Sequence, residues 1–213
     1  MNIEGNLYPM GPMLYRSKIP TDLVDQLLER GNKSNLDHRD HLAGILEKES
    51  AYPDDDREFF AREIEPCMTD FIRAFDTYYQ QELLTAPQSR SFELMDLWIN
   101  YMHRGDFNPP HVHYGDFSFV IYLQVPEQIR EEFENHKNVT GNRNGPGCIE
   151  FLSGMSVSWF INKSSFFPEV GDIFIFPADL YHTVAPFKSD VVRISVSGNL
   201  GIRAIQNEHA MAI

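Results

Sequence analysis

The second half of the sequence is broken into short runs of β-branched and aromatic residues, with turn residues rather than helical patterns between them. The runs cover residues 91–102, 117–125, 147–152, 156–161, 172–177 and 191–199. Each run has the length and composition of a strand. Because parallel strands need long crossover connections, this series favours antiparallel pairing. We therefore predict a mainly β (α+β) fold whose core is a sandwich or barrel of antiparallel strands.

The first of these runs also predicts which side chains share a face. Successive side chains of a strand point to opposite sides of the sheet, so residues two or four apart lie together. Four apolar residues of the run are spaced in this way: Phe92, Leu94, Trp98 and Met102. We expect these four side chains on one side of the sheet.

Two amphipathic helices are predicted in the first part of the chain. The first begins at Thr21 and ends near Gly31, since glycine is typical of helix C-termini. The second covers residues 57–84, where apolar side chains recur at steps of three and four. These side chains are Phe60, Ile64, Met68, Phe71, Phe75 and Tyr79. Pro66 predicts a kink or two helices in sequence, and the polar residues 32–56 are expected to form a loop.

The length of 213 residues fits a single domain. We divide this domain into an N-terminal helical part, residues 1–90, and a β core, residues 91–200. The helices are expected to pack on the outer face of a sheet. A long polar insertion, residues 126–146, interrupts the core. Because long loops inside compact domains are often functional, we predict that this insertion forms a lid over the substrate.

Charge and composition exclude several classes of partner. The formal net charge is −13, which opposes binding to a phosphate backbone, so we predict no nucleic-acid partner. No apolar run approaches the ~18 residues of a membrane span, so no membrane partner is expected. The N-terminus lacks the layout of a signal peptide. The two cysteines, Cys67 and Cys148, indicate a reducing compartment rather than a disulfide framework. We therefore predict a cytoplasmic protein.

The stretch NPPHVHYGD, residues 108–116, places His111 and His113 one residue apart. In an extended segment these two side chains point the same way, and the preceding Pro109-Pro110 favours extension. Two neutral imidazoles that converge on one point form a bidentate metal ligand. The alternative is a pair of histidines on a solvated face. The spacing alone leaves both interpretations open.

Two further residues favour the metal interpretation. His182 follows a predicted strand about 70 residues downstream, and antiparallel strands of a barrel can return it to the same end. Arg193 lies in a β-branched strand, with Ser195 on the same face. A guanidinium in such a strand is costly unless its charge is paired. It either points outward to solvent or faces the barrel interior, where it would bind a small carboxylate through its planar fork.

Together these residues resemble the double-stranded β-helix oxygenases, a jelly-roll or cupin-like fold, that use Fe(II) and 2-oxoglutarate. The resemblance is to the prolyl-hydroxylase-like branch of that superfamily and covers roughly residues 92–200. A subgroup from marine bacteria and their phages shares the His-x-His motif. The matching positions are Trp98, Asn100, Tyr101, Gly105, His111, His113, Tyr122, Leu123, Gly171, Asp172, Phe176, Pro177, His182, Arg193, Ser195 and Asn199.

The resemblance implies roles for eight of these residues. The metal ligands, and thus the catalytic centre, would be His111, His113 and His182. Binding of 2-oxoglutarate would fall to Arg193, Tyr122, Ser195, Tyr101 and Asn100. The implied enzyme is a dioxygenase that hydroxylates a peptidyl side chain, for example a prolyl one, or a small molecule, and releases succinate and CO2. A homodimer is left open.

One position departs from the superfamily at large, which has His-x-Asp where this chain has His111-x-His113. Either the iron takes three imidazoles, or Asp116 supplies the carboxylate. Asp116 points away from the histidines in an unbroken strand, although a bulge at Gly115 could redirect it. Two other functions also remain: a cupin-type three-histidine metalloprotein that does not use 2-oxoglutarate, and a non-catalytic β-barrel binding module.

Overall fold

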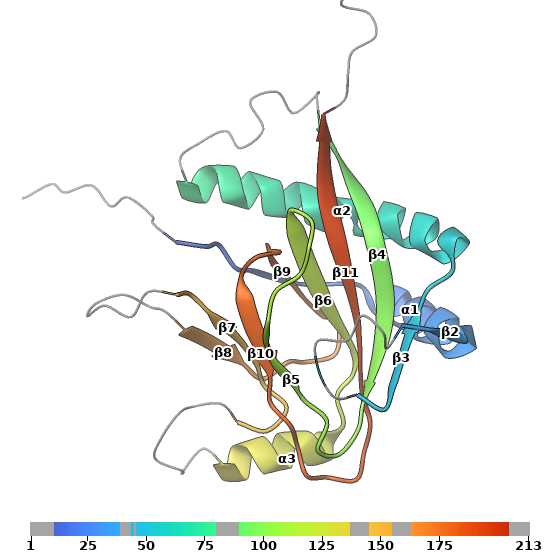
Figure 1. The fold of residues 1–213 in the computed structure, drawn as a ribbon, viewed down its shortest axis with the longest axis vertical. Coiled ribbons are helices and arrows are strands. Elements are labelled where there is room, and N and C mark those ends of the chain that lie inside the picture. The colour runs from blue at the N-terminus through green and yellow to red at the C-terminus, as the bar shows by residue number, and fades with distance from the viewer. Residues whose placement is uncertain are drawn as a thin grey trace, which may run out of the picture.

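The structure is a computed structural model, which describes residues 11–38, 44, 46–79, 90–136, 145–154 and 163–204. Two antiparallel sheets face each other, and helices cover the outer face of the larger sheet (Figure 1). This arrangement confirms the predicted mainly β fold with N-terminal helices packed on the outer sheet. None of the helices in the described ranges is long and apolar enough to cross a membrane.

The larger sheet has seven strands, and every pairing within it is antiparallel. Their spatial order is β1 (Tyr15–Lys18), β9 (Asp172–Pro177), β6 (Phe117–Gln124), β11 (Arg193–Ala204), β4 (Arg90–Met102), β3 (Lys48–Ala51) and β2 (Leu36–Asp37). The N-terminal part, which was predicted to be helical, therefore also supplies strands at both edges of this sheet.

The smaller sheet has four antiparallel strands and faces the middle of the larger one (Figure 1). Their spatial order is β5 (Asn108–His111), β10 (Tyr181–Val184), β7 (Ile149–Leu152) and β8 (Lys163–Phe166). The strand predicted at residues 156–161 lies outside the described residues. Four strands of the two sheets, β4, β6, β7 and β9, lie close to their predicted ranges, whereas β11 continues five residues beyond position 199.

Helix α2 (Asp54–Tyr79) lies across the outer face of the larger sheet, as its apolar stripe predicts. Phe60 and Phe71 are fully buried, with ring centroids 5.6 Å from Phe119 and 4.9 Å from Phe117, respectively. The helix runs through Pro66 as one element, so the alternative of two helices is wrong. Packing of an apolar helix face supplies most helical stability in proteins, and here it outweighs the hydrogen bond that proline removes.

Helix α1 (Thr21–Lys33) packs beside α2 on the same face of the sheet. Gly31 was predicted to lie at the end of this helix, but the helix continues through it to Lys33. A Cβ atom at Gly31 would come within 2.4 Å of Ile99 Cδ1 and 2.6 Å of Tyr52 Oη. Glycine fits here because the helix packs closely against the side chains of Ile99 and Tyr52, which a larger residue would have to displace.

The prediction that Phe92, Leu94, Trp98 and Met102 share one face of β4 is wrong. Phe92 and Leu94 contact the helix-side core, whereas Trp98 and Met102 face the space between the sheets. The pairing of β4 with β11 explains this difference: Asp96 pairs with Asn199 and Leu94 with Leu200, so Met95 is an extra residue. A β-bulge of this kind exchanges the faces of all residues on one side of it.

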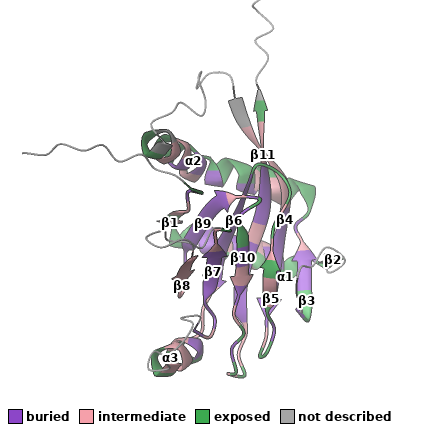
Figure 2. Cartoon of the chain, turned by 60° about the vertical axis from the view of Figure 1, so that its left-hand side comes forward, coloured by how far each residue is buried: buried purple, intermediate pink, exposed green. Residues whose placement is uncertain are grey.

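A second core lies between the two sheets and is largely aromatic. It includes Tyr122, Phe151, Phe174 and Phe176 (Figure 2, purple strands). Helix α3 (Glu127–His136) covers one end of this core through Ile129, which is fully buried. Helix α3 is the described part of the insertion predicted to be a lid, and residues 137–144 of that insertion lie outside the described residues.

Replacement of Phe60 by alanine is expected to destabilise the fold strongly. The ring is fully buried between α2 and the sheet, and loss of such a side chain typically lowers the free energy of unfolding by about 3–5 kcal/mol. Equilibrium unfolding in urea measures the change. Glu63→Ala on the exposed side of the same helix is the control and should change it by less than about 0.5 kcal/mol. Equal effects of the two substitutions would contradict the observed packing.

Candidate metal centre

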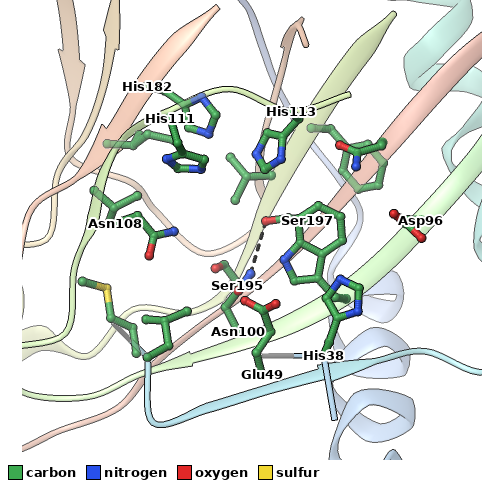
Figure 3. Close-up of a pocket in the computed structure, with 18 of the residues that line it drawn as sticks. His38, Glu49, Asp96, Asn100, Asn108, His111, His113, His182, Ser195 and Ser197 are labelled. Atoms are coloured by element: carbon green, nitrogen blue, oxygen red, sulfur yellow. Dashed lines mark hydrogen bonds between the residues drawn. The ribbon is translucent and has the colours of Figure 1, made fainter. Parts of the chain in front are cut away.

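A pocket with a cavity volume of about 350 Å³ lies between the two sheets (Figure 3). Its walls come from β3, β4, β6, β9 and β11 of the larger sheet and from β5, β7 and β10 of the smaller one. Three histidines, His111, His113 and His182, line the pocket from the smaller sheet, and Arg193 lines it from the larger one. No described residue of the insertion 126–146 contributes to its lining.

The three histidines form one cluster, as the motif spacing predicts. The pairing of β5 with β10 places His182 directly opposite His111, and His113 follows the end of β5. The ring centroids of His111 and His182 are 4.2 Å apart, and each ring lies 5.0 Å from that of His113. One nitrogen from each ring lies within 4.8 Å of the others. Among the described residues this is the one group of three or more potential ligands placed to hold a metal ion.

Backbone carbonyls orient two of the three imidazoles. Nδ1 of His111 donates to the carbonyl of Pro109 at 2.7 Å, and Nδ1 of His182 donates to the carbonyl of Leu180 at 3.0 Å. A proton held on Nδ1 leaves the lone pair on Nε2, so both rings present a ligand nitrogen to the pocket. This is the arrangement that metal-bound histidines commonly show.

Burial keeps the cluster uncharged. Burial, together with the neighbouring His111, lowers the pKa of His113 to about 4 and that of His182 to about 3. Burial also lowers the pKa of His111. Neutral imidazole is the form that binds metal ions, so protons do not compete for the site near neutral pH.

Arg193 is a buried cation without an acidic partner among the described residues. Its side chain is 3% exposed, Nη1 donates to the carbonyl of Gly147 at 2.8 Å, and Nη2 contacts Met102 Sδ at 2.8 Å. Nε is buried without a hydrogen-bond partner. Burial lowers the pKa of Arg193. The cost of an unpaired buried charge indicates that this end of the pocket accepts an anion.

Tyr122 lies directly beside this guanidinium. The Arg193 Cζ atom is 5.2 Å from the centroid of the Tyr122 ring, and the Tyr122 hydroxyl is fully buried without a hydrogen-bond partner. Burial raises the pKa of Tyr122 to about 12, although the charge of Arg193 acts in the opposite direction. The hydroxyl is thus protonated at neutral pH and can donate a hydrogen bond. A ligand bound to Arg193 would lie close to the Tyr122 side chain.

The strand register places Ser195 and Asn100 beside Tyr122 on the face of the larger sheet that lines the pocket. Ser195 on β11 pairs with Tyr122 on β6 and with Asn100 on β4, and all three line the pocket. Asn100 Nδ2 donates to Ser197 Oγ at 3.2 Å (Figure 3, dashed line). The structure therefore brings these residues to the pocket that contains Arg193 and the three histidines.

Tyr101 is not brought to this pocket. It lies on the opposite face of β4, in the helix-side core, where its hydroxyl donates to Asn32 Oδ1 at 2.8 Å. The physical reason is the alternation of the strand, since Asn100 and Met102 face inward. Asp116 is also engaged elsewhere: it is exposed, and its carboxylate accepts the amide of Ile202 at 2.7 Å. The histidine cluster thus contains no carboxylate.

Two residues that line the pocket were missed by sequence analysis, His38 and Glu49. His38 follows β2 and stacks on Trp98 at 5.4 Å, and Trp98 in turn lies 5.6 Å from His113. Glu49 belongs to β3. The sequence of this strand, KESA, shows no apolar alternation, so no signal marked it as part of the sheet.

Comparison with known proteins assigns the fold to a class. The chain is similar to HygX from Streptomyces hygroscopicus, solved with iron bound, with 10% identity, 90% of this chain and 82% of that one covered, and a TM-score of 0.51. It is also similar to a prolyl hydroxylase from Trichoplax adhaerens in complex with a hypoxia inducible factor peptide fragment, with 12% identity, 92% and 83% coverage, and a TM-score of 0.50. The shared fold is the jelly roll of 2-oxoglutarate oxygenases.

The family follows from the sequence. Residues 96–199 match the model of the family described as "Putative 2OG-Fe(II) oxygenase". This part of the chain, which contains the histidine cluster and Arg193, is therefore similar to the 2OG-Fe(II) oxygenases. The chain also spans half of a 2OG-Fe(II) family oxidoreductase from Burkholderia pseudomallei, with 15% identity, 61% of this chain covered and a TM-score of 0.40. No curated protein matches the sequence. The predicted resemblance to 2OG-Fe(II) oxygenases is confirmed, and the marine subgroup stays a prediction.

His182→Ala is expected to abolish stable metal binding. His182 is the most buried of the three ligands and faces His111 across the ladder, so its loss leaves two donors. Changes to residues that merely support a ligand weaken metal affinity by 10- to 100-fold, so loss of a ligand should cost at least about 100-fold. Titration with Co(II), followed by its visible absorption, measures the affinity. His103→Ala, a histidine outside the cluster, is the control and should bind Co(II) as the unchanged protein does.

The metal-free protein is expected to lose stability as the pH falls from 7 to 5. The pKa values of His113 and His182 are about 4 and about 3 in the folded protein, against 6.5 for unperturbed histidine. Their stabilising contribution is therefore complete above pH 6.5 and declines as protonation favours the unfolded chain. At pH 5 each histidine should lower the free energy of unfolding by about 2 kcal/mol.

Urea unfolding at pH 7 and pH 5 measures this loss. The matched control is the double variant His113→Phe, His182→Phe, which retains all other titrating groups. The decrease in its free energy of unfolding between pH 7 and pH 5 should be smaller than that of the unchanged protein by about 4 kcal/mol. Identical losses in the two proteins would show that these imidazoles are not held neutral by burial.

Proposed function

We propose that the protein is an Fe(II)- and 2-oxoglutarate-dependent dioxygenase whose metal ligands are His111, His113 and His182. The observation that supports this most directly is that three neutral imidazoles and one acid-free buried guanidinium line a single pocket. A metal site alone would not require the guanidinium. An anion site alone would not require the imidazoles.

The histidine cluster fits a divalent metal ion. Imidazole suits iron, zinc, copper and nickel, whereas oxygen-rich sites suit magnesium and calcium. The two backbone hydrogen bonds to Nδ1 favour the ligand tautomer of His111 and His182. Because no carboxylate belongs to the cluster, the bound metal would keep its full positive charge, which favours an anionic cosubstrate beside it.

The Arg193 end of the pocket fits the far carboxylate of 2-oxoglutarate. Arg193 Nε and the Tyr122 hydroxyl are both buried without a partner, and both belong to residues that line the pocket. A carboxylate bound there would pair with the guanidinium and accept the tyrosine hydroxyl, which removes two unsatisfied groups at once. Ser195 and Asn100, on the same face of the larger sheet, are proposed to hydrogen-bond the cosubstrate or an ordered water.

In this proposal dioxygen would be the oxidant, and the iron, when bound, would supply the redox chemistry: one oxygen atom would hydroxylate the substrate and the other would enter succinate as 2-oxoglutarate loses CO2. The protein's own residues would position the metal and the cosubstrate and would limit the access of water to them. The histidines hold the metal, and Arg193 with Tyr122 fixes the orientation of the dicarboxylate. Phe176 and Trp98 line the pocket with apolar surface, which limits water around the metal.

We further propose that the substrate is a peptidyl side chain, for example prolyl, or a small molecule. The prolyl hydroxylase of Trichoplax adhaerens, which shares the fold, was solved with a peptide fragment. The pocket is lined partly by the exposed residues Val112 and Tyr114, so its entrance is framed by side chains that a substrate could contact. We also propose that residues 126–146 form a lid over the substrate, that the protein is cytoplasmic and that it forms a homodimer.

One observation favours a second candidate. A set of three imidazoles without a carboxylate also suits a cupin-type metalloprotein that does not use 2-oxoglutarate. The two candidates differ in the role of Arg193, which only the first requires. Succinate formed in proportion to 2-oxoglutarate consumed would support the dioxygenase, and metal-dependent activity without it would support the cupin.

Arg193→Ala is expected to weaken 2-oxoglutarate binding by about 2–5 kcal/mol, because loss of one partner from a buried, hydrogen-bonded charge pair has effects of this size. The measurement is anaerobic titration of the Fe(II)-loaded protein with 2-oxoglutarate, followed by the visible charge-transfer band of the chelate. Arg203→Ala is the matched control, since Arg203 lies on the same strand but is exposed and pairs with Glu93. The Arg203→Ala protein should bind 2-oxoglutarate as tightly as the unchanged protein does. Absence of the band from the unchanged protein would refute the cosubstrate.

A further inference from the structure

Glu49 is a buried carboxyl group that the proposed chemistry does not use. It lies on β3, is 4% exposed, and lines the pocket. Figure 3 shows its carboxylate pointing into the space between the sheets, across from the imidazoles. Among the described residues no hydrogen bond or ion pair engages this carboxylate, although buried acids are almost always paired.

The strand register places Glu49 at a defined distance from the proposed cosubstrate site. Glu49 pairs with Asn100, Asn100 with Ser195, and Ser195 with Tyr122, so the four form a polar row across β3, β4, β11 and β6. Neighbouring strands lie about 4.8 Å apart, which puts Glu49 roughly 10 Å from Ser195 and farther from Tyr122. Glu49 therefore lies at the opposite end of this row from Tyr122, the residue beside Arg193.

The charges of the pocket are divided between its two ends. Arg193 is the sole arginine or lysine among the lining residues, and it lies at the Tyr122 end. The acidic lining residues are Glu49 and Asp96, at the β3 side and on β4. Asp96 already accepts the hydroxyl of Tyr114, so Glu49 is the acid that is left for a ligand.

Burial also makes Glu49 unfavourable as an isolated anion. Burial, together with the charge of nearby Asp37, raises the pKa of this carboxyl to about 8. A positively charged group placed against the carboxylate would offset both effects and restore the ionised form. The net charge of −13 acts in the same direction, because an acidic protein attracts cations toward such a cleft.

We propose that Glu49 binds the side-chain ammonium or guanidinium of the substrate, so that the enzyme acts on a basic amino acid, either free or within a peptide. This inference rests on the proposed function and names its substrate class. Arg193 then holds the anionic cosubstrate at one end of the pocket, and Glu49 holds the cationic substrate at the other. The three histidines that would hold the metal line the same pocket from the side of the smaller sheet.

The test compares probes that differ only in side-chain charge. The protein is loaded with Fe(II) and 2-oxoglutarate without oxygen, and binding is measured by calorimetry. The free probes are L-arginine against L-citrulline and L-lysine against L-norleucine. The peptide probes are terminally blocked pentapeptides of alanine with a central arginine or citrulline. The charged member of at least one pair should bind about ten- to hundredfold more tightly, and which pair responds distinguishes a free amino acid from a peptide.

Two variants assign this preference to Glu49. Glu49→Gln keeps the size of the side chain and should reduce the preference to within about twofold. Asp37→Asn removes an acidic group on the neighbouring strand outside the pocket lining, and should retain the preference. The preference would then be a property of one carboxylate rather than of the overall charge.

The outcomes separate this inference from the proposed function. The visible band of the Fe(II)–2-oxoglutarate complex is recorded before each titration. If the unchanged protein lacks the band, the proposed function fails and this inference fails with it. If the band is present but neutral probes bind as well as charged ones, or no probe binds, or Glu49→Gln keeps the preference, this inference alone is overturned. Loss of the band in Glu49→Gln would also overturn it, because Glu49 would then support the metal or cosubstrate site.

Discussion

The site depends on the ladder between β5 and β10. These two short strands pair antiparallel, with His182 opposite His111. Cross-strand neighbours in an antiparallel sheet lie about 5 Å apart, so the pairing itself brings together two ligands that are distant in the chain. His113 lies two residues beyond the end of β5, where its amide donates to the carbonyl of Ala178 at 2.8 Å. Slippage of the ladder by one residue would turn an imidazole away from the pocket, since alternate residues face opposite sides.

The sequence predicted the histidine cluster and the buried arginine because the patterns that mark them are local. His-x-His after two prolines, a later histidine and an arginine in a β-branched strand are each visible in a few residues. Residues 117–124 and 172–177 are apolar enough to be recognised as buried strands, and both were predicted. The apolar spacing in α2 likewise predicts its contact with the sheet. In these segments burial and composition agree.

The errors arise where tertiary structure overrides local pattern. The bulge at Met95 reverses the faces of β4, and no residue in that run identifies the bulge, so Phe92 and Trp98 were wrongly placed together. Tyr101 was assigned to the pocket by resemblance, although simple alternation with Asn100 places it on the other face. Strands β3 and β10 were missed because each has only four residues, and some of these line the pocket, where polar and charged side chains are needed.

The hydrogen bonds from His111 and His182 to Pro109 and Leu180 have an evolutionary consequence. In many metal sites a side-chain carboxylate holds the ring, so a single mutation of that supporting residue disturbs the metal. Here the acceptors are main-chain oxygens, which every amino acid possesses. A substitution at position 109 or 180 therefore retains the acceptor, provided that the backbone path is kept. Mutations at the two acceptor positions therefore leave the tautomers of His111 and His182 unchanged, because the hydrogen bonds go to main-chain oxygens.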